Sequence, residues 1–323
     1  MTRPDTRRLA VAMAIAVLGT ASLIAGAAAA QTVPASLLSP PPRDAPHMAI
    51  GADLFASTDA DDTDVIKAGV TFDWVHDDPD HYLGVRLEEA RFKPLGQSSV
   101  DDQRAYLRFA DTQGRWKWNG QIGSDGDTAL GAFNIHKESR LRPEFFVERE
   151  IVETPIGVDR GLYYTFVGGA FDVPLNDRNT FTVVAGVQDF TGDNVRTHLR
   201  VNYVHVIKPE WGLSAQVRTR YFHSSDPGEF DYFSPRWYAE VIPVLQVRRY
   251  SGGWRYVVAA GLGAQKDSET DWRSSRYFNA QITSPPVGRD WAVTAAFTYS
   301  NTPVGSGNVY DYNQVTLGLT RVF

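Results

Sequence analysis

The chain has 323 residues, no cysteine and a formal net charge of -6. The absence of cysteine excludes disulfides, thiolate metal sites and a lipidated amino-terminal cysteine. With 32 Lys and Arg against 38 Asp and Glu, the sequence contains no basic block and no nucleic-acid-binding signature, so nucleic acid is not an expected partner. The mean hydropathy of -0.29 resembles that of a soluble protein, but apolar and polar residues that alternate along a transmembrane strand also cancel in such an average.

The amino-terminal segment predicts export. Three arginines within the first eight residues precede an uncharged stretch, residues 9–30, which ends in four consecutive alanines. This order is typical of a secretory signal peptide; a permanent membrane anchor is the alternative. We therefore expect residues 1–30 to be a cleaved signal peptide and residues 31–46, which are rich in Pro and Ser, to be a flexible periplasmic lead-in.

From residue 47 onward, apolar residues recur at every second position. The stretch from Ile66 to Trp74 shows this period, and so do the stretches that begin at Phe181, Leu199, Trp211 and Trp291. Such alternation indicates strands with one apolar and one polar face, and no segment sustains a helical period over two turns. We expect about sixteen strands, beginning near His47, Val65, Tyr82, Gln103, Arg115, Leu130, Glu144, Leu162, Asn179, Val195, Trp211, Arg236, Trp254, Arg276, Asp290 and Tyr310.

The connections between these strands alternate in length. Residues 77–80 and 208–210 are short and turn-like, whereas residues 224–235 and 267–275 are longer and more polar. Bacterial barrels have an even number of strands, short periplasmic turns and long outer loops. Residues 47–323 are therefore predicted to form an all-β, antiparallel up-and-down transmembrane barrel in the bacterial outer membrane, in contact with lipid and lipopolysaccharide. A secreted soluble β-protein is the alternative.

The last strand carries a possible assembly signal. The chain stops at Phe323, and Val315, Leu317 and Leu319 lie on the same predicted face, although Arg321 interrupts it. A terminal aromatic residue on an alternating strand resembles the recognition signal of outer-membrane barrels. That resemblance implies the barrel assembly machinery as a partner and Phe323 as the residue it reads.

A sixteen-stranded barrel is wide enough for an aqueous channel, and the alternation predicts which side chains line it. The predicted inward face holds Lys67, Asp73, Arg86, Glu88, Arg104, Tyr106, Arg108, Lys117, Gln121, Glu148, Glu150, Arg196, Arg200, Gln216, Arg218, Arg220, Tyr238, Glu240, Arg248, Arg255, Tyr277 and Gln281. Guanidinium groups bind carboxylates and hydroxyls, whereas facing rows of Arg and Glu can also simply brace a pore wall. The candidate substrate path consists of Arg104, Arg108, Arg196, Arg200, Arg218, Arg220, Tyr238, Glu240, Arg248 and Arg255.

The residues that could carry chemistry do not form a recognisable catalytic or metal-binding pattern. His223-Ser224-Ser225-Asp226 has the residue types of a hydrolase, but adjacent residues on a strand do not face each other. The His and Asp residues between 76 and 81 have the spacing of a tight turn, and the acidic loop 59–64 lacks the pattern of a calcium loop. We expect no enzyme activity, no metal and no cofactor.

The stretch Asp231-Tyr232-Phe233-Ser234-Pro235-Arg236-Trp237-Tyr238 resembles a segment of the barrel domain in the outer-membrane subunit of bacterial cellulose synthase. Arg248-Arg249-Tyr250 and Gly261-Leu262-Gly263 extend the similarity, as does the corner Gln188-Asp189-Phe190 with Gly192-Asp193-Asn194 and Arg196. The related exporter of poly-N-acetylglucosamine has a similar sixteen-stranded barrel. The resemblance covers roughly residues 148–323 and implies a barrel that exports a polysaccharide.

One large feature departs from that family. Its members carry a long periplasmic array of tetratricopeptide helices, which this sequence does not show. The resemblance therefore implies either a separate periplasmic scaffold protein as a partner or a barrel that has lost the export role. We expect an outer-membrane channel for a polysaccharide, anionic or neutral. The alternatives are a structural or receptor-like barrel with a plugged lumen, and a barrel-embedded hydrolase that would depend on His223 or His198.

Overall fold

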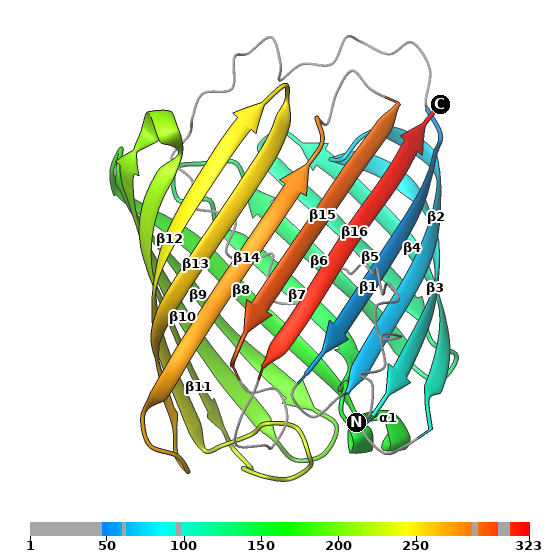
Figure 1. The fold of residues 1–323 in the computed structure, drawn as a ribbon. Coiled ribbons are helices and arrows are strands. Elements are labelled where there is room, and N and C mark those ends of the chain that lie inside the picture. Colours follow the sequence, from blue (N-terminus) through cyan, green and yellow to red (C-terminus); the bar gives the residue numbers. More distant parts are fainter. Residues whose placement is uncertain (1–46, 60–62, 95–97, 286–289, 303–310) are drawn as a thin grey trace, which may run out of the picture.

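The computed structural model describes residues 47–59, 63–94, 98–285, 290–302 and 311–323, so the expected signal peptide and lead-in lie outside the described residues. Within the described part, sixteen antiparallel strands close into one barrel, as the sequence predicted (Figure 1). The strands are β1 (Ala49–Thr58), β2 (Asp64–Asp78), β3 (His81–Lys93), β4 (Val100–Gln113), β5 (Trp116–Ser124), β6 (Ala129–Lys137), β7 (Glu144–Ile151), β8 (Tyr163–Asn176), β9 (Asn179–Phe190), β10 (Val195–Lys208), β11 (Leu213–Ser224), β12 (Trp237–Ser251), β13 (Trp254–Asp267), β14 (Arg273–Thr283), β15 (Trp291–Ser300) and β16 (Tyr312–Val322).

The barrel closes where the first strand pairs with the last. The register of β1 and β16 runs from Ala49 opposite Val322 to Thr58 opposite Asn313. Beyond it, Met48 and Phe323 exchange two backbone hydrogen bonds of 3.1 and 2.9 Å. Each strand also pairs with its sequence neighbours, and every expected strand start lies within three residues of the observed one. Closure leaves no strand edge unpaired, which a bilayer requires.

Two short helical segments were not expected from the sequence. These are α1 (Pro155–Arg160), between β7 and β8, and η3 (Pro209–Trp211), between β10 and β11. The α1 helix is capped by the Thr154 side chain, begins with Pro155 and ends at Gly161, whose φ of 63° is left-handed. These are ordinary helix boundary signals, but six residues are too few to show a helical period. Among the described residues, no helix has the length and apolar character that a membrane span requires.

The polar and apolar faces are arranged as in a membrane protein. On β2, Val70 and Phe72 point outward and are 56% and 40% exposed, whereas Lys67, Thr71 and Asp73 point inward and are buried. Around the barrel, large apolar side chains such as Leu87, Ile122, Val167 and Leu245 are more than half exposed on the outer face, whereas inward Arg, Glu and Tyr side chains are buried or partly buried. An apolar outside and a polar inside suit lipid rather than water.

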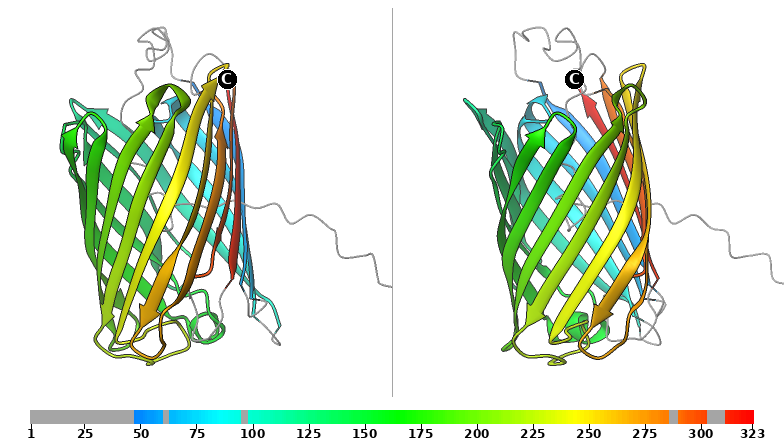
Figure 2. Two further views of the ribbon diagram at one scale, coloured as in Figure 1. Left: turned by 60° about the vertical axis from the view of Figure 1, so that its left-hand side comes forward. Right: turned by 90° about the vertical axis from the view of Figure 1, so that its left-hand side faces the viewer.

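The two ends of the barrel differ. At the end of the barrel where β1 begins and β16 ends, the turns between strands are short, as at Gly252-Gly253 between β12 and β13. The opposite end carries the long connections, including the one that holds α1, as Figure 1 and both views in Figure 2 show. By the rule for bacterial barrels, the short turns are periplasmic and the long loops are extracellular.

The lipid-facing assignment can be tested at the middle of β3. Replacement of Leu87, which is 57% exposed, by Arg is expected to lower the free energy of unfolding by about 2–4 kcal/mol, because a charge would face the bilayer midplane. Urea unfolding in lipid vesicles measures the change. The control is Gln103→Arg, on the same outer face but nearer the rim and opposite Glu89, where about 0–1 kcal/mol is expected. Equal losses in the two variants would contradict the assignment.

Candidate functional site

The inner face of the barrel encloses a cavity of about 480 Å³, lined by side chains from strands all around the barrel and from the extracellular loops. The register places inward-facing residues of neighbouring strands opposite one another, for example Arg200 opposite Arg220 and Arg220 opposite Glu240. By this alternation every residue of the candidate substrate path projects from the inner wall: Arg104, Arg108, Arg196, Arg200, Arg218, Arg220, Tyr238, Glu240, Arg248 and Arg255. Their part in transport remains a prediction.

On one side of the lumen, formed by β1 to β4 and β7, the inward charges other than Glu148 are paired. Arg104 lies 2.9 Å from Glu150 and 3.2 Å from Glu88, with its side chain fully buried. Arg86 pairs with Asp53 and, at 2.6 Å, with Glu88. On this side, facing Arg and Glu side chains brace the pore wall, which is one of the two roles that the sequence suggested for them. We call this side the paired wall.

Some of these ion pairs cross the lumen. Lys67 on β2 lies 3.3 Å from Glu150 on β7 and 2.7 Å from Glu153 just beyond it. Because β2 and β7 are not neighbours in the sheet, these contacts bring the end of β7 and the chain just after it across the lumen to β2. Residues 152–162, which follow β7 and include α1, are called the inner loop below. Their neighbour Ile151 joins a buried cluster of β1 to β3, completed by Phe55, Val65, Ala90 and Phe92, with Val158 packed against it.

A second loop, residues 225–236 between β11 and β12, fastens the inner loop from the other side. The Asp231 carboxylate accepts hydrogen bonds from the Thr154 hydroxyl at 2.6 Å and from the Ile156 backbone N–H at 2.8 Å. Arg196 donates a 2.5 Å hydrogen bond to the Phe233 carbonyl. Asp231 and Phe233 belong to the segment that carried the family resemblance. Its structural role is to hold two loops together at the extracellular mouth.

A third loop, between β9 and β10, joins this assembly. Glu229 accepts hydrogen bonds from the backbone N–H groups of Asp193 and Asn194, at 2.6 and 3.1 Å. The Asn194 side chain donates to the Tyr232 hydroxyl at 2.9 Å, and the Tyr232 ring stacks on Phe190 at 4.4 Å. Burial raises the pKa of Tyr232 to about 12, so its hydroxyl stays protonated at physiological pH.

One cluster of acidic side chains lies at this end among the described residues. Carboxylate oxygens of Asp193, Asp226 and Glu229 lie within 4.8 Å of one another, but both oxygens of Glu229 already accept backbone hydrogen bonds. In the acidic loop noted in the sequence, residues 60–62 lie outside the described residues, and Asp59 accepts a hydrogen bond from the Thr63 N–H at 3.0 Å.

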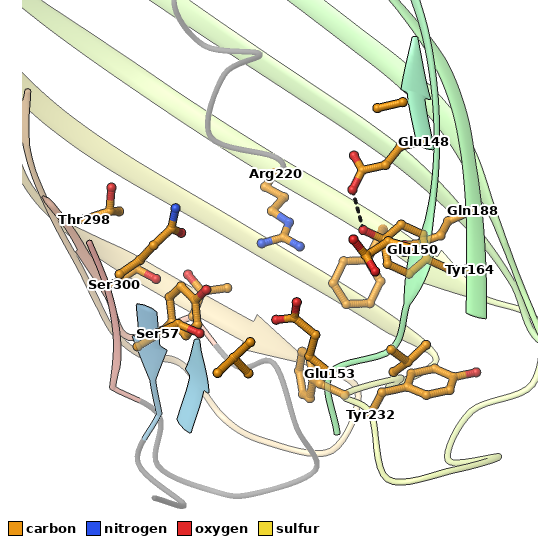
Figure 3. A pocket seen from close by; sticks show the side chains of 18 of the residues that line it. Ser57, Glu148, Glu150, Glu153, Tyr164, Gln188, Arg220, Tyr232, Thr298 and Ser300 are labelled. Carbon is orange, nitrogen blue, oxygen red and sulfur yellow. Dashed lines mark hydrogen bonds between the residues drawn. The ribbon is translucent and has the colours of Figure 1, made fainter. Parts of the chain in front are cut away.

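The opposite side of the lumen, formed by β10 to β13, is different and is called the arginine wall below. It carries Arg196, Arg200, Arg218, Arg220, Arg248 and Arg255, and among the described residues none of these six forms an ion pair within 4.0 Å. Arg218 donates to Gln216 at 2.9 Å and lies over the Tyr277 ring at 4.6 Å. The guanidinium of Arg220 extends into the cavity, as Figure 3 shows. The two walls therefore present different electrostatic surfaces to a solute.

The hydrolase alternative finds no support in this geometry. His223 and Ser224 are consecutive on β11 and point to opposite faces, with Ser224 buried inside and His223 exposed outside. His198 faces inward, but its Nε2 lies 3.0 Å from the Gln188 amide oxygen rather than beside a hydroxyl nucleophile.

Sequence reasoning missed several residues of the site. Asp53 lies on a regularly alternating strand and could have been found by extending the period to β1. Glu153 and Tyr232 lie in loops, where alternation has no meaning, and only their place in the tertiary structure brings them into the lumen. Tyr164 was also missed; its hydroxyl donates a 2.6 Å hydrogen bond to Glu148 (Figure 3).

Lys67 provides a test of the cross-lumen contact. Lys67→Ala leaves Glu150 and Glu153 without this cation, so we expect a loss of roughly 3 kcal/mol in the free energy of unfolding and a larger single-channel conductance as the inner loop leaves the β2 wall. Urea unfolding and planar-bilayer recording measure the two effects. Lys117→Ala, which removes only an exposed pair with Asp80, is the control. Lost stability without a change in conductance would show that the loop does not restrict the lumen.

Asp231 provides a test of the loop assembly. Asp231→Asn weakens both hydrogen bonds to the inner loop, so we expect faster hydrogen exchange at the Ile156 amide, by about tenfold, and earlier proteolysis within residues 225–236. Hydrogen exchange followed by mass spectrometry measures the change. Asp226→Asn, at an exposed residue of the same loop, should leave both rates as in the parent protein. Unchanged exchange in Asp231→Asn would mean that the two loops hold their positions independently.

Comparison with known proteins supports the fold. No family model matches the chain, and no curated protein matches it in sequence. It is similar to a solved structure described as a bacterial polysaccharide outer membrane secretin, with a TM-score of 0.62 and 12% identity over 85% of this chain and 98% of that one. OprD of Pseudomonas aeruginosa matches with a TM-score of 0.41 and 9% identity, over 86% and 94% of the two chains. OccK5 of the same organism matches with 0.40 and 7%, over 86% and 98%.

The first of these likenesses confirms, at the level of the fold, the resemblance to polysaccharide-export barrels that the sequence indicated. Together with the closed sixteen-stranded sheet and its apolar outer surface, it identifies the chain as an outer-membrane β-barrel with a channel fold.

Proposed function

We propose that this barrel is a passive outer-membrane channel through which a polysaccharide leaves the cell, with no chemical step of its own. The observation that carries the proposal is the arginine wall, where guanidinium groups face the cavity without ion-pair partners among the described residues. Such groups hydrogen-bond hydroxyls and carboxylates, which are the polar groups of sugar chains. The fold shared with a protein described as a polysaccharide outer membrane secretin supports the same function.

Transit requires contacts that release as readily as they bind. The lumen offers many moderate contacts rather than one tight pocket. Tyr277 and Tyr312 line the cavity beside amide and hydroxyl side chains such as Gln188, Thr298 and Ser300. Aromatic rings provide apolar surface for sugar faces, and the amides and hydroxyls exchange hydrogen bonds with water at little cost. We propose that a chain moves along this lining by replacing one weak contact with the next.

A second candidate function is favoured by the inner loop. Its ion pairs to Lys67 and its packing against β1 to β3 place protein within the lumen at the extracellular end. A structural or receptor-like barrel with a plugged lumen would have this feature. Under the export proposal the same loop narrows the exit, and export then requires it to leave a path or to move.

The proposed partners follow from the location. Lipid and lipopolysaccharide surround the apolar outer face, and the barrel assembly machinery reads the last strand with Phe323 at its end. We further propose that a separate periplasmic scaffold protein delivers the polysaccharide to the short-turn end of the barrel.

Planar-bilayer recording of the refolded mature protein tests the channel proposal. We expect steady conductance steps, an anion preference set by the arginine wall, and partial block by added oligosaccharides. The reason is that unpaired cations in a narrow aqueous path attract anions and repel cations. Cation preference would contradict the assigned lumen electrostatics. Heat-modifiable folding without any conductance would favour the plugged barrel.

A further inference from the structure

Two arginines face each other directly on the arginine wall. Arg200 on β10 and Arg220 on β11 are partners in the sheet register, and both line the cavity. Like charges directly opposite each other on neighbouring strands destabilise a sheet. The buried Nε of Arg220 has no hydrogen-bond partner among the described residues. A repulsive pair that projects into a cavity, with an unsatisfied donor, points to a negatively charged ligand.

The nearest carboxylates do not form ion pairs with these arginines. Glu240 is opposite Arg220 in the register, but its Oε1 accepts hydrogen bonds from Ser275 at 2.7 Å, Thr302 at 2.9 Å and Tyr238 at 3.1 Å. These three hydroxyls hold the Glu240 carboxylate in place on the wall, and no ion pair within 4.0 Å is formed with Arg220. On the far side of Arg200 in the register stands Val184, which adds no charge.

The remaining acid near the pair is also engaged. Glu148 on β7 accepts a 2.6 Å hydrogen bond from the Tyr164 hydroxyl and forms no ion pair among the described residues. The Arg220 guanidinium lies over the rings of Phe222 and Tyr238, at 5.7 Å from each, which limits its contact with water on that side. Poor hydration and missing counter-charge both increase the attraction for an anion.

We propose that Arg200 and Arg220 form a subsite for the carboxylate of an acidic sugar unit, which makes the exported polymer a polyanion. The proposal rests on the channel function and deepens it. Two planar guanidinium groups match the two coplanar oxygens of one carboxylate. Glu240 and Glu148 stand close enough to moderate the positive potential, so the bound group can leave again, as transport requires.

The neighbouring arginines extend the subsite into a path. Arg218 lies two positions along β11 from Arg220, towards the periplasmic end, and Arg196 lies four positions along β10 from Arg200, towards the extracellular end. Alternate residues of a strand are roughly 7 Å apart. A carboxylate released from Arg220 therefore meets Arg218 roughly 7 Å away, whereas Arg196 lies about twice that distance from Arg200.

The test uses the full mature protein in bilayers and in detergent, with Arg200→Gln and Arg220→Gln as the variants. The probe is a uronic-acid oligosaccharide, compared with the same oligosaccharide after its carboxyls have been reduced to alcohols. We expect the acidic probe to block conductance and raise the unfolding temperature of the parent protein more than the neutral one does. Each variant should weaken both effects by at least about tenfold in probe concentration.

Arg249→Gln is the control, because Arg249 lies on the outer face of β12 near its periplasmic end, outside the lumen, and donates to the Glu210 carbonyl at 3.0 Å. It should retain block by the acidic probe. Without any probe, Arg200→Gln should unfold at a higher temperature than the parent protein, since the repulsion is gone. Equal effects of the acidic and neutral probes, or equal losses in all three variants, would overturn the subsite. Thermal stabilisation by the acidic probe in a barrel that never conducts would overturn the channel function and leave the subsite standing.

Discussion

Pairing of β1 with β16 is the interaction on which the rest of this molecule depends. A bilayer offers no hydrogen-bond partner to an open strand edge, so the sheet is stable there only once it is closed. Closure gives every strand one face towards lipid and one towards the lumen. Each side chain must therefore suit the environment that its position in the alternating sequence assigns to it. The same constraint forces charged residues such as Lys67 and Arg200 to find either a partner or water inside the barrel.

The lumen resolves that requirement in two different ways. On the paired wall, carboxylates of β1, β3, β4 and β7 neutralise Arg86 and Arg104, and the result is a braced, rigid surface. On the arginine wall, the guanidinium groups stack on Phe and Tyr rings and bond to amides, so they remain able to bind a solute. Charges that pair with one another and guanidinium groups without ion pairs are thus separated between two sides of one sheet in the part of the chain that the structure describes.

The extracellular mouth joins these two sides. The inner loop is held to the paired wall through Lys67 and, through Asp231, to the loop that Arg196 anchors on the arginine wall. The inner loop is thus held by polar contacts to both sides of the lumen and by apolar packing of Val158 and Ile156. Of the residues that resemble export barrels, Asn194, Arg196 and residues 231–233 lie in this assembly, whereas residues 248–250 and 261–263 lie on β12 and β13.

The sequence by itself determined the barrel, its sixteen strands and the inward direction of residues such as Arg200, Arg220 and Glu240. The reason is that alternation depends only on residues close together in the sequence. Because a shift of one residue would exchange the inner and outer faces of a whole strand, the apolar face of each strand fixes which side chains point inward. It did not determine which inward charges are neutralised. Lys67 and Glu150 are 83 positions apart on strands that do not pair in the sheet, and Glu153, which also contacts Lys67, lies in a loop. Glu153, Asp231 and the capped α1 helix lie in loops without a period. Only the tertiary structure therefore decided that one wall is paired and that the arginines of the other form no ion pair among the described residues.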